Sequence, residues 1–174
     1  MQDFWVFGYG SLMWRPGFDH VEAAPARIAG VHRALCVYSY VHRGTPERPG
    51  LVLGLDRGGS CVGMAFRVAA EKRDETLAYL RAREQVTMVY KESIRRVVLE
   101  DGSGRAAQAI AYVVDRDHEQ YAGVLPEGQV IDIVRHGKGQ SGPNVEYVVN
   151  TARHLEELSI RDHRLTAIAD ALSG

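Results

Sequence analysis

The first fourteen residues carry the feature that most constrains this fold. An apolar, aromatic run from Phe4 to Phe7 stops at Gly8-Tyr9-Gly10-Ser11, where two glycines are one residue apart. The run predicts a buried strand and the glycines a tight loop, because glycine adopts positive φ and lets a ligand approach the main chain. Successive N–H groups in such a loop can bind an anion, and a plain glycine turn is the alternative. A dinucleotide-binding fingerprint is not expected, because its third glycine is replaced by Met13.

Strand-like segments fill the first two thirds of the chain, and helical segments fill the last third. We expect strands over 32–40, 51–55, 61–68, 90–99 and 105–114, a helix over about 71–85, and helices that begin near Pro126, Pro143 and Asp162. Segments 51–55 and 61–68 should form one hairpin, and 90–99 and 105–114 another. This order predicts an α+β fold with a mixed or mainly antiparallel sheet, which can curl into a barrel. No linker divides the chain, so 1–174 is expected to be one domain.

Composition and charge bear on which partners, location and metal sites this protein is expected to have. A formal net charge of −1 gives no global attraction for nucleic acid or an anionic membrane, so neither is expected as a partner. The chain has neither an apolar run of about 20 residues nor a signal-peptide pattern, so we expect a cytoplasmic location. Cys36 and Cys61 lie in apolar runs typical of buried thiols. The seven histidines lack metal-ligand spacing, so no metal site is expected.

A carboxylate falls on the apolar face of the first predicted helix. Leu77, Leu80 and Glu84 stand at i, i+3 and i+7, and i+7 returns to within about 20° of i. Burial of a carboxylate is costly and raises its pKa, which suits a group that accepts and returns a proton. Two alternatives stay open: the helix ends just before Glu84, whose side chain then points to water, or Arg81 or Arg83 neutralises it.

Two tyrosines lie near predicted apolar surfaces. Tyr90 begins a strand, and Tyr147 lies beside the apolar stripe of the helix that follows the glycine-containing segment 139–142. That stripe is expected to consist of Val145, Val148, Ala152 and Leu155. Each tyrosine is compatible with simple packing in which its hydroxyl finds a partner, or with a place in a binding site.

Taken together, these segments resemble the ChaC-type γ-glutamylcyclotransferases, the glutathione-specific branch of the γ-glutamylcyclotransferase-like family. The matching pieces occur in family order over most of the chain and are 6–14, 42–46, Tyr79-Leu80 with Arg83-Glu84, and 141–147. The first is highly specific when it is paired with the downstream Arg-Glu. Between Glu84 and Tyr90 the chain reads Gln85-Val86-Thr87-Met88-Val89, where some relatives carry a glycine-rich link.

The resemblance implies a small barrel flanked by helices and an enzyme that cleaves glutathione into 5-oxoproline and cysteinylglycine without a cofactor. The γ-glutamyl amine attacks its own γ-carbonyl, and well-oriented intramolecular reactions reach effective molarities of about 10⁵–10⁸ M. Glu84 is implied as the catalytic base and then acid. Main-chain amides of the glycine loop would hold the α-carboxylate or the developing oxyanion. The implied substrate-binding residues are Gly8, Tyr9, Gly10, Ser11, Leu12, Met13, Arg43, Tyr90 and Tyr147.

Arg43 is hypothesised to bind the glycine carboxylate of glutathione, and a solvated arginine in a loop is the alternative. Two other functions stay open. One is a cyclotransferase that acts on other γ-glutamyl amino acids or on γ-glutamylamines. The other is a non-catalytic domain that binds a small molecule in the glycine loop.

Overall fold

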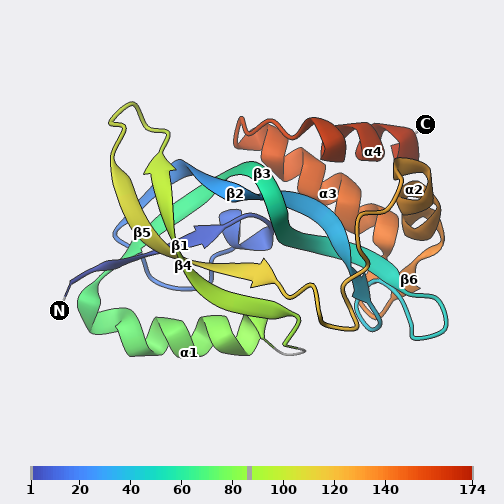
Figure 1. The fold of residues 1–174 in the computed structure, drawn as a ribbon, viewed down its shortest axis with the longest axis horizontal. Coiled ribbons are helices and arrows are strands. Elements are labelled where there is room, and N and C mark those ends of the chain that lie inside the picture. Colours follow the sequence, from blue (N-terminus) through green and yellow to red (C-terminus); the bar gives the residue numbers. More distant parts are fainter. Residues whose placement is uncertain (1, 86–87, 174) are drawn as a thin grey trace. The chain divides into compact units, whose positions relative to one another are not determined.

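A computed structural model describes residues 2–85 and 88–173 (Figure 1). The strands are β1 (Phe4–Gly8), β2 (Glu22–Ser39), β3 (Gly50–Val68), β4 (Tyr90–Leu99), β5 (Ala106–Val114), β6 (Lys138–Gly139) and β7 (Gly142–Pro143). The helices are α1 (Arg73–Glu84), α2 (Glu127–His136), α3 (Asn144–Glu157) and α4 (His163–Ser173), with short 3₁₀ turns at Ser11–Met13 and Ala70–Lys72.

The five long strands close into a barrel in the order β1-β3-β2-β4-β5. β1 is antiparallel to β3 and parallel to β5, so that Trp5 pairs with both Arg67 and Ala109. The predicted hairpin of β4 and β5 is present, with Tyr90 opposite Val114. The sheet is therefore mixed, and the α+β small-barrel fold is confirmed.

The chain divides into two compact units, and both β2 and β3 pass from one to the other. Unit 1 comprises the residues up to Arg33 and Leu55–Asp115, with β1, α1, β4 and β5. Unit 2 comprises Ala34–Gly54 and the residues from Arg116 onward, with helices α2 to α4.

The hairpin predicted about residues 56–60 is wrong. β3 continues from Gly50 to Val68, and Gly58 and Gly59 lie inside it with φ values of +104° and +71°. The Gly58 carbonyl oxygen lies 2.9 Å from His32 Nδ1 on β2, the neighbouring strand in the barrel. Glycines with positive φ can form a bulge within a strand as readily as the turn of a hairpin, so the Gly58-Gly59 sequence is compatible with both.

β2 also starts ten residues before the predicted strand. Ala24, Ala26 and Ile28 are buried with the period of two that a half-buried strand requires. The small side chains of the two alanines make the alternation of apolar and polar residues hard to recognise in the sequence. At Gly30, which has a φ of +87°, the buried positions also change from even-numbered to odd-numbered residues. The strand is therefore visible in the tertiary structure and weak in the sequence.

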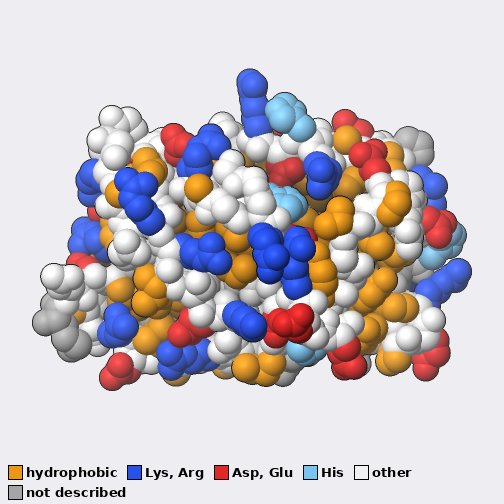
Figure 2. Space-filling view, in the orientation of Figure 1, with side chains coloured by type: hydrophobic (Ala, Val, Ile, Leu, Met, Phe, Trp, Pro, Cys, Tyr) orange, Lys and Arg blue, Asp and Glu red, His pale blue; other side chains and the backbone are white. Residues whose placement is uncertain are grey.

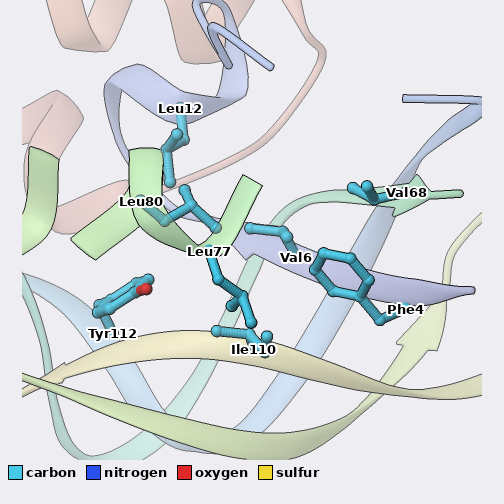
Figure 3. Close-up of a cluster of buried hydrophobic side chains, with 8 residues drawn as sticks. All are labelled: Phe4, Val6, Leu12, Val68, Leu77, Leu80, Ile110 and Tyr112. Atoms are coloured by element: carbon cyan, nitrogen blue, oxygen red, sulfur yellow. The ribbon is translucent and has the colours of Figure 1, made fainter. Parts of the chain in front are cut away.

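In unit 1, α1 covers the barrel through one apolar cluster (Figure 3). Leu77 and Leu80 supply the inner face of the helix, and Leu80 has no exposed surface. The cluster consists of Phe4, Val6, Leu12, Val68, Leu77, Leu80, Ile110 and Tyr112. Because Leu12 belongs to the glycine loop, hydrophobic burial attaches this loop to the same helix that carries Glu84.

In unit 2 the helices begin near Pro126, Pro143 and Asp162, as predicted. α2 lies between Pro126 and Gly137, and the side chain of Asp162 accepts the Leu165 N–H at 3.0 Å at the start of α4. The predicted stripe of α3 is partly wrong, since Val145 and Ala152 are only half-buried. The residues that are buried on α3 are Asn144, Val148, Thr151 and Leu155. Polar Asn144 and Thr151 occupy this face because both are hydrogen-bonded there.

Cys36 and Cys61 are buried thiols that are not joined in a disulfide, as predicted. In the described part of the chain, no helix has the length and apolar character needed to cross a membrane. Acidic side chains lie among basic ones on the face drawn in Figure 2, in keeping with the small net charge.

Candidate active site

Glu84 is the last residue of α1, on the face predicted from the spacing. Its side chain is 16% exposed, one turn beyond the fully buried Leu80, so the alternative in which it points to water is wrong. Burial raises the pKa of this carboxyl, and the charge of Arg83 opposes that rise. Arg83 Nε lies 3.8 Å from Glu84 Oε1, which is an ion pair without a hydrogen bond. Glu84 is therefore a largely desolvated carboxyl group with one cationic neighbour, Arg83.

Several backbone N–H groups of the glycine loop have no acceptor among the described residues. Met13 N–H donates to Gly10 O at 2.9 Å and starts the 3₁₀ turn. The amides of Gly10, Ser11 and Leu12 donate no hydrogen bond to any of the described residues. A Cβ on Gly8 would lie 2.8 Å from Leu12 Cβ, so only glycine allows the loop to fold back this closely. Three successive unused donors are the arrangement that an anion requires.

Arg83 joins this loop to α1. Its Nη2 donates to Ser11 Oγ at 2.7 Å, and its Nη1 donates to Arg15 O at 2.8 Å and to Pro16 O at 3.2 Å. The same guanidinium is the cation next to Glu84. A single side chain thus connects the loop and the carboxylate, and the two elements lie on the same side of unit 1.

A second arginine holds the loop from the interior. Arg33 on β2 is 6% exposed and donates to Tyr9 O at 2.7 Å and to Val62 O at 2.8 Å. Its Nη2 also lies 3.8 Å from the Met13 sulfur, so it contacts both ends of the loop. In a trans peptide the C=O and the next N–H point in opposite directions, so a Tyr9 carbonyl held by Arg33 directs the Gly10 N–H away from it.

Tyr90 and Tyr112 belong to the apolar region of unit 1 against which α1 packs. Tyr90 packs against the apolar cluster, and its carbonyl accepts a hydrogen bond from the side chain of Gln85 at 3.1 Å. Tyr112 is 1% exposed within that cluster, and its pKa is raised by burial, by Glu92 and by the charge of Glu84. Of the link between Glu84 and Tyr90, Val86 and Thr87 lie outside the described residues.

In unit 2, Arg43 and Tyr147 contact each other. The Arg43 guanidinium lies 5.6 Å from the Tyr147 ring centroid and donates to Pro143 O at 3.1 Å. The Tyr147 hydroxyl accepts the Leu53 N–H at 2.9 Å. Fully buried Asn144 accepts the Leu51 N–H at 2.8 Å and donates to Leu51 O at 2.9 Å. Segment 141–147 therefore has a structural role, because its polar side chains attach it to β3.

The sequence is similar to known proteins over almost its whole length. The family model described as ChaC-like protein matches residues 4–173. The chain belongs to the ChaC-like family. An Escherichia coli relative named glutathione-specific γ-glutamylcyclotransferase is 32% identical over 161 residues, which cover 92% of this chain and 69% of the relative. A human relative named glutathione-specific γ-glutamylcyclotransferase 1 is also 32% identical, over 98% of this chain and 79% of its own length.

Solved structures agree with the ChaC-like assignment. The crystal structure of a yeast γ-glutamyl cyclotransferase specific to glutathione superposes with a TM-score of 0.87 at 25% identity, covering 99% of this chain and 96% of the yeast chain. A Bacillus subtilis protein, YkqA, reaches a TM-score of 0.52 at 18% identity and shows the fold alone.

Arg33, and the hydrogen bond between Glu92 and Tyr112, are not among the features expected from the sequence of this ChaC-like chain. A signal for Arg33 was available, because it stands two residues after Val31 on a strand of period two, and both side chains are buried. Arg83 was identified as a possible neutralising charge, but its contacts with the loop were not foreseen. Glu92 on β4 faces Tyr112 on β5 across the hairpin expected from 90–99 and 105–114, so the sequence implied that they are opposite each other, and only their hydrogen bond was not foreseen.

Proposed function

We propose that this ChaC-like chain is a glutathione-specific γ-glutamylcyclotransferase that releases 5-oxoproline and cysteinylglycine. One arrangement carries the proposal. Glu84 is largely desolvated at the end of α1, and Arg83 beside it donates a hydrogen bond to Ser11 in the glycine loop, where three amides donate to none of the described residues. The names of the relatives support the substrate.

The proposed reaction needs no nucleophile from the protein, because the attacking amine and the carbonyl belong to one molecule. Glu84 takes a proton from the α-ammonium, and the freed nitrogen bonds to the γ-carbonyl carbon. The bond from that carbon to the cysteine nitrogen then breaks. Of the three ammonium protons, one stays on the lactam nitrogen and two move by way of Glu84 to the departing nitrogen, which leaves as an ammonium. General acid–base catalysis of this kind contributes about 10²–10⁴-fold.

The loop amides suit a negative charge, either the α-carboxylate of the substrate or the oxyanion on the γ-carbonyl. Arg83 and Arg33 hold the loop for this purpose. Tyr90 and Tyr147 remain proposed substrate contacts. Arg43 is proposed to bind the glycine carboxylate of glutathione, as a cationic fork suits a carboxylate. A cytoplasmic location, without nucleic-acid or membrane partners, also stays a proposal.

The test is incubation of the purified protein with reduced glutathione and mass detection of the products. We expect 5-oxoproline and cysteinylglycine in equal amounts. A parallel panel of γ-glutamyl-alanine and a γ-glutamylamine tests the substrate, and a higher kcat/KM on either of these would replace glutathione in the proposal. Binding of glutathione without any 5-oxoproline after prolonged incubation would favour a binding domain.

A further inference from the structure

The Arg83 guanidinium donates hydrogen bonds to uncharged acceptors, although a carboxylate lies beside it. Within the described residues its acceptors are Ser11 Oγ, Arg15 O, Pro16 O and the Tyr79 hydroxyl, at 2.7 to 3.2 Å. Glu84 is not among them, since Arg83 Nε lies 3.8 Å from Glu84 Oε1. A hydrogen bond from a guanidinium to a carboxylate is about twice as strong as one between neutral groups. Other contacts must therefore hold Arg83 in a different direction.

Tyr79 is the acceptor that lies on α1 itself. It stands four residues before Arg83, which is the spacing that makes two side chains neighbours on a helix. Its hydroxyl accepts a hydrogen bond from Arg83 Nη1 at 2.9 Å, and the guanidinium carbon lies 6.0 Å from the centroid of its ring. Both contacts direct the guanidinium one turn back along α1, whereas Glu84 is the residue that follows Arg83.

The segment after the glycine loop fixes the position of Tyr79. Gly17 has a φ of +77°, and a Cβ at this position would overlap the Tyr79 hydroxyl oxygen, so the main chain passes directly against that hydroxyl. Phe18 contacts the Tyr79 ring edge-on, with the ring centroids 6.4 Å apart, and also packs against the apolar cluster of unit 1. The Tyr79 hydroxyl is therefore held next to Arg83 from both sides.

The distance between Arg83 and Glu84 is short enough for a small movement to change the base. Hydrogen bonds from a guanidinium to a carboxylate have N···O distances of about 2.7–2.9 Å, so a movement of about 1 Å would form one. Such a bond stabilises the ionised carboxylate, and Glu84 would become a weaker base. It would also occupy a carboxylate oxygen that could otherwise accept a hydrogen bond from the α-ammonium of the substrate.

We propose that Tyr79 is a positioning residue that keeps the Arg83 guanidinium on the glycine loop and out of hydrogen-bond contact with Glu84. Arg83 then holds the loop without occupying a carboxylate oxygen of the base. This inference rests on the proposed function.

Charged or titratable side chains also occur on the elements of unit 1 that pack against α1. Within the described residues they are Tyr9 and Arg15 in and after the glycine loop, Tyr90 and Glu92 on β4, Tyr112 on β5, and Tyr79, Arg81 and Arg83 on α1 itself. Of these, Arg83 has a nitrogen within ion-pair distance of the Glu84 carboxylate. A change in the position of Arg83 should therefore be visible in the titration of Glu84.

The test is a double-mutant cycle of Tyr79→Phe and Arg83→Gln, with kcat/KM for glutathione measured from pH 5 to 9. Tyr79→Phe keeps the ring but removes the acceptor, so Arg83 can turn toward Glu84. The acid limb of the pH profile should move about half a pH unit lower, and kcat/KM at pH 7 should fall about threefold. In the Arg83→Gln background, Tyr79→Phe should leave the limb in place and change kcat/KM by less than about 1.5-fold.

Tyr38→Phe is the control for loss of a phenol hydroxyl. Tyr38 is partly buried on β2, and its hydroxyl has no partner among the described residues, so the limb should stay in place. Equal effects of Tyr79→Phe with and without Arg83 would overturn the proposal. A limb that stays in place or moves to higher pH in Tyr79→Phe would also overturn it.

Gly17→Ala tests the same contact from the other side. The added Cβ would displace the Tyr79 hydroxyl, so the acid limb should move lower, as in Tyr79→Phe. Gly102→Ala is the matched control, because Gly102 also has a positive φ, of +87°, and a Cβ there would have no atom within 4 Å. A limb that moves no further in Gly17→Ala than in Gly102→Ala would contradict the role of the Tyr79 hydroxyl.

A measurement without turnover separates this proposal from the proposed function. The Glu84 carboxyl can be titrated by ¹³C NMR and assigned with Glu84→Gln. Its midpoint should be lower in folded Tyr79→Phe than in the wild type, whether or not glutathione is cleaved. An unchanged midpoint would overturn the proposal, whereas a lowered midpoint in a protein whose wild type forms no 5-oxoproline would overturn the proposed function alone.

Discussion

The candidate residues of unit 1 and those of unit 2 differ in how fully their polar groups are used. In unit 1 the amides of Gly10, Ser11 and Leu12 donate to none of the described residues, and Glu84, largely shielded from solvent, lies beside Arg83 without a hydrogen bond to it. In unit 2 the Tyr147 hydroxyl is bonded to the Leu53 amide, and the guanidinium of Arg43 is bonded to Pro143 O.

This difference is the basis on which the proposed roles of the two sets of residues can be ranked. Burial of polar groups without partners is costly, so a fold keeps such groups where a ligand can satisfy them. Glu84 is largely desolvated and the loop offers amides with no partner among the described residues, whereas Arg43 and Tyr147 are engaged in local contacts. Substitutions in unit 1 should therefore affect turnover most, and those in unit 2 should affect it least.

The largest effect is expected for Glu84→Gln. Loss of the base should reduce kcat at least about 100-fold, because general acid–base catalysis contributes about 10²–10⁴-fold. The measurement is the initial rate of 5-oxoproline formation, with Glu100→Gln as a surface control that keeps the wild-type rate. If Glu84→Gln kept more than about a tenth of the wild-type rate, the assignment of Glu84 as the base would fail.

The same variant should be more stable than the wild type at pH 7. Burial raises the pKa of Glu84 in the folded state. The contribution of Glu84 to the free energy of unfolding is therefore fully present below its pKa in the unfolded chain, about 4.3, and is lost as the pH rises through its pKa in the folded protein. Thermal unfolding should therefore give a higher Tm for Glu84→Gln at pH 7, and the difference should shrink toward pH 4. Equal Tm values at pH 7 would show that Glu84 is not strained by burial.

Arg33→Lys should be next in size, at about tenfold in kcat/KM, because lysine cannot hold both Tyr9 O and Val62 O with one planar group. A rise in KM alone would mean that the loop binds the α-carboxylate, which is present in the bound substrate. A fall in kcat alone would mean that the loop binds the oxyanion, which forms only during the reaction. Arg27→Lys on the same strand is the matched control. Unchanged kinetics in folded Arg33→Lys would contradict its role in positioning the loop.

Arg83→Gln should move the acid limb of kcat/KM to higher pH. The charge of Arg83 lowers the pKa of Glu84, so its removal lets that pKa rise further and leaves less base at a given pH. Arg83→Lys retains the charge and should weaken activity a few-fold through the loop, with little movement of the limb. An upward shift in Arg83→Lys as large as in Arg83→Gln would argue against a charge effect.

The smallest effect is expected for Arg43→Ala, about fivefold on glutathione, because Pro143 O and the Tyr147 ring already engage part of the guanidinium. If Arg43 binds the glycine carboxylate, γ-glutamyl-alanine should lose less than glutathione. Equal losses on both substrates would exclude that role. A loss as large as that of Glu84→Gln would break the distinction between the two units.

Local patterns were sufficient for the elements whose signals are short-range. The strand before Gly8, the helix from Arg73 to Glu84 and the hairpin of β4 and β5 follow from periodicity and turn residues, and the helical spacing alone placed Glu84 on the buried face. The resemblance to the family added the assignment of the loop. These features depend on residues within a few turns of one another, so the sequence by itself determined them.

Only the tertiary structure decided how the charges around Glu84 are arranged. Arg33 reaches Tyr9, Arg83 reaches Ser11 and Tyr112 reaches Glu92 across 24, 72 and 20 residues of sequence. Packing against the barrel brings Arg33 and Arg83 to the loop, whereas Tyr112 faces Glu92 across the β4–β5 hairpin, and burial raises the pKa of Glu84 and of Tyr112. Because hydrogen bonds and pKa values depend on distance and burial, no local pattern could have specified them.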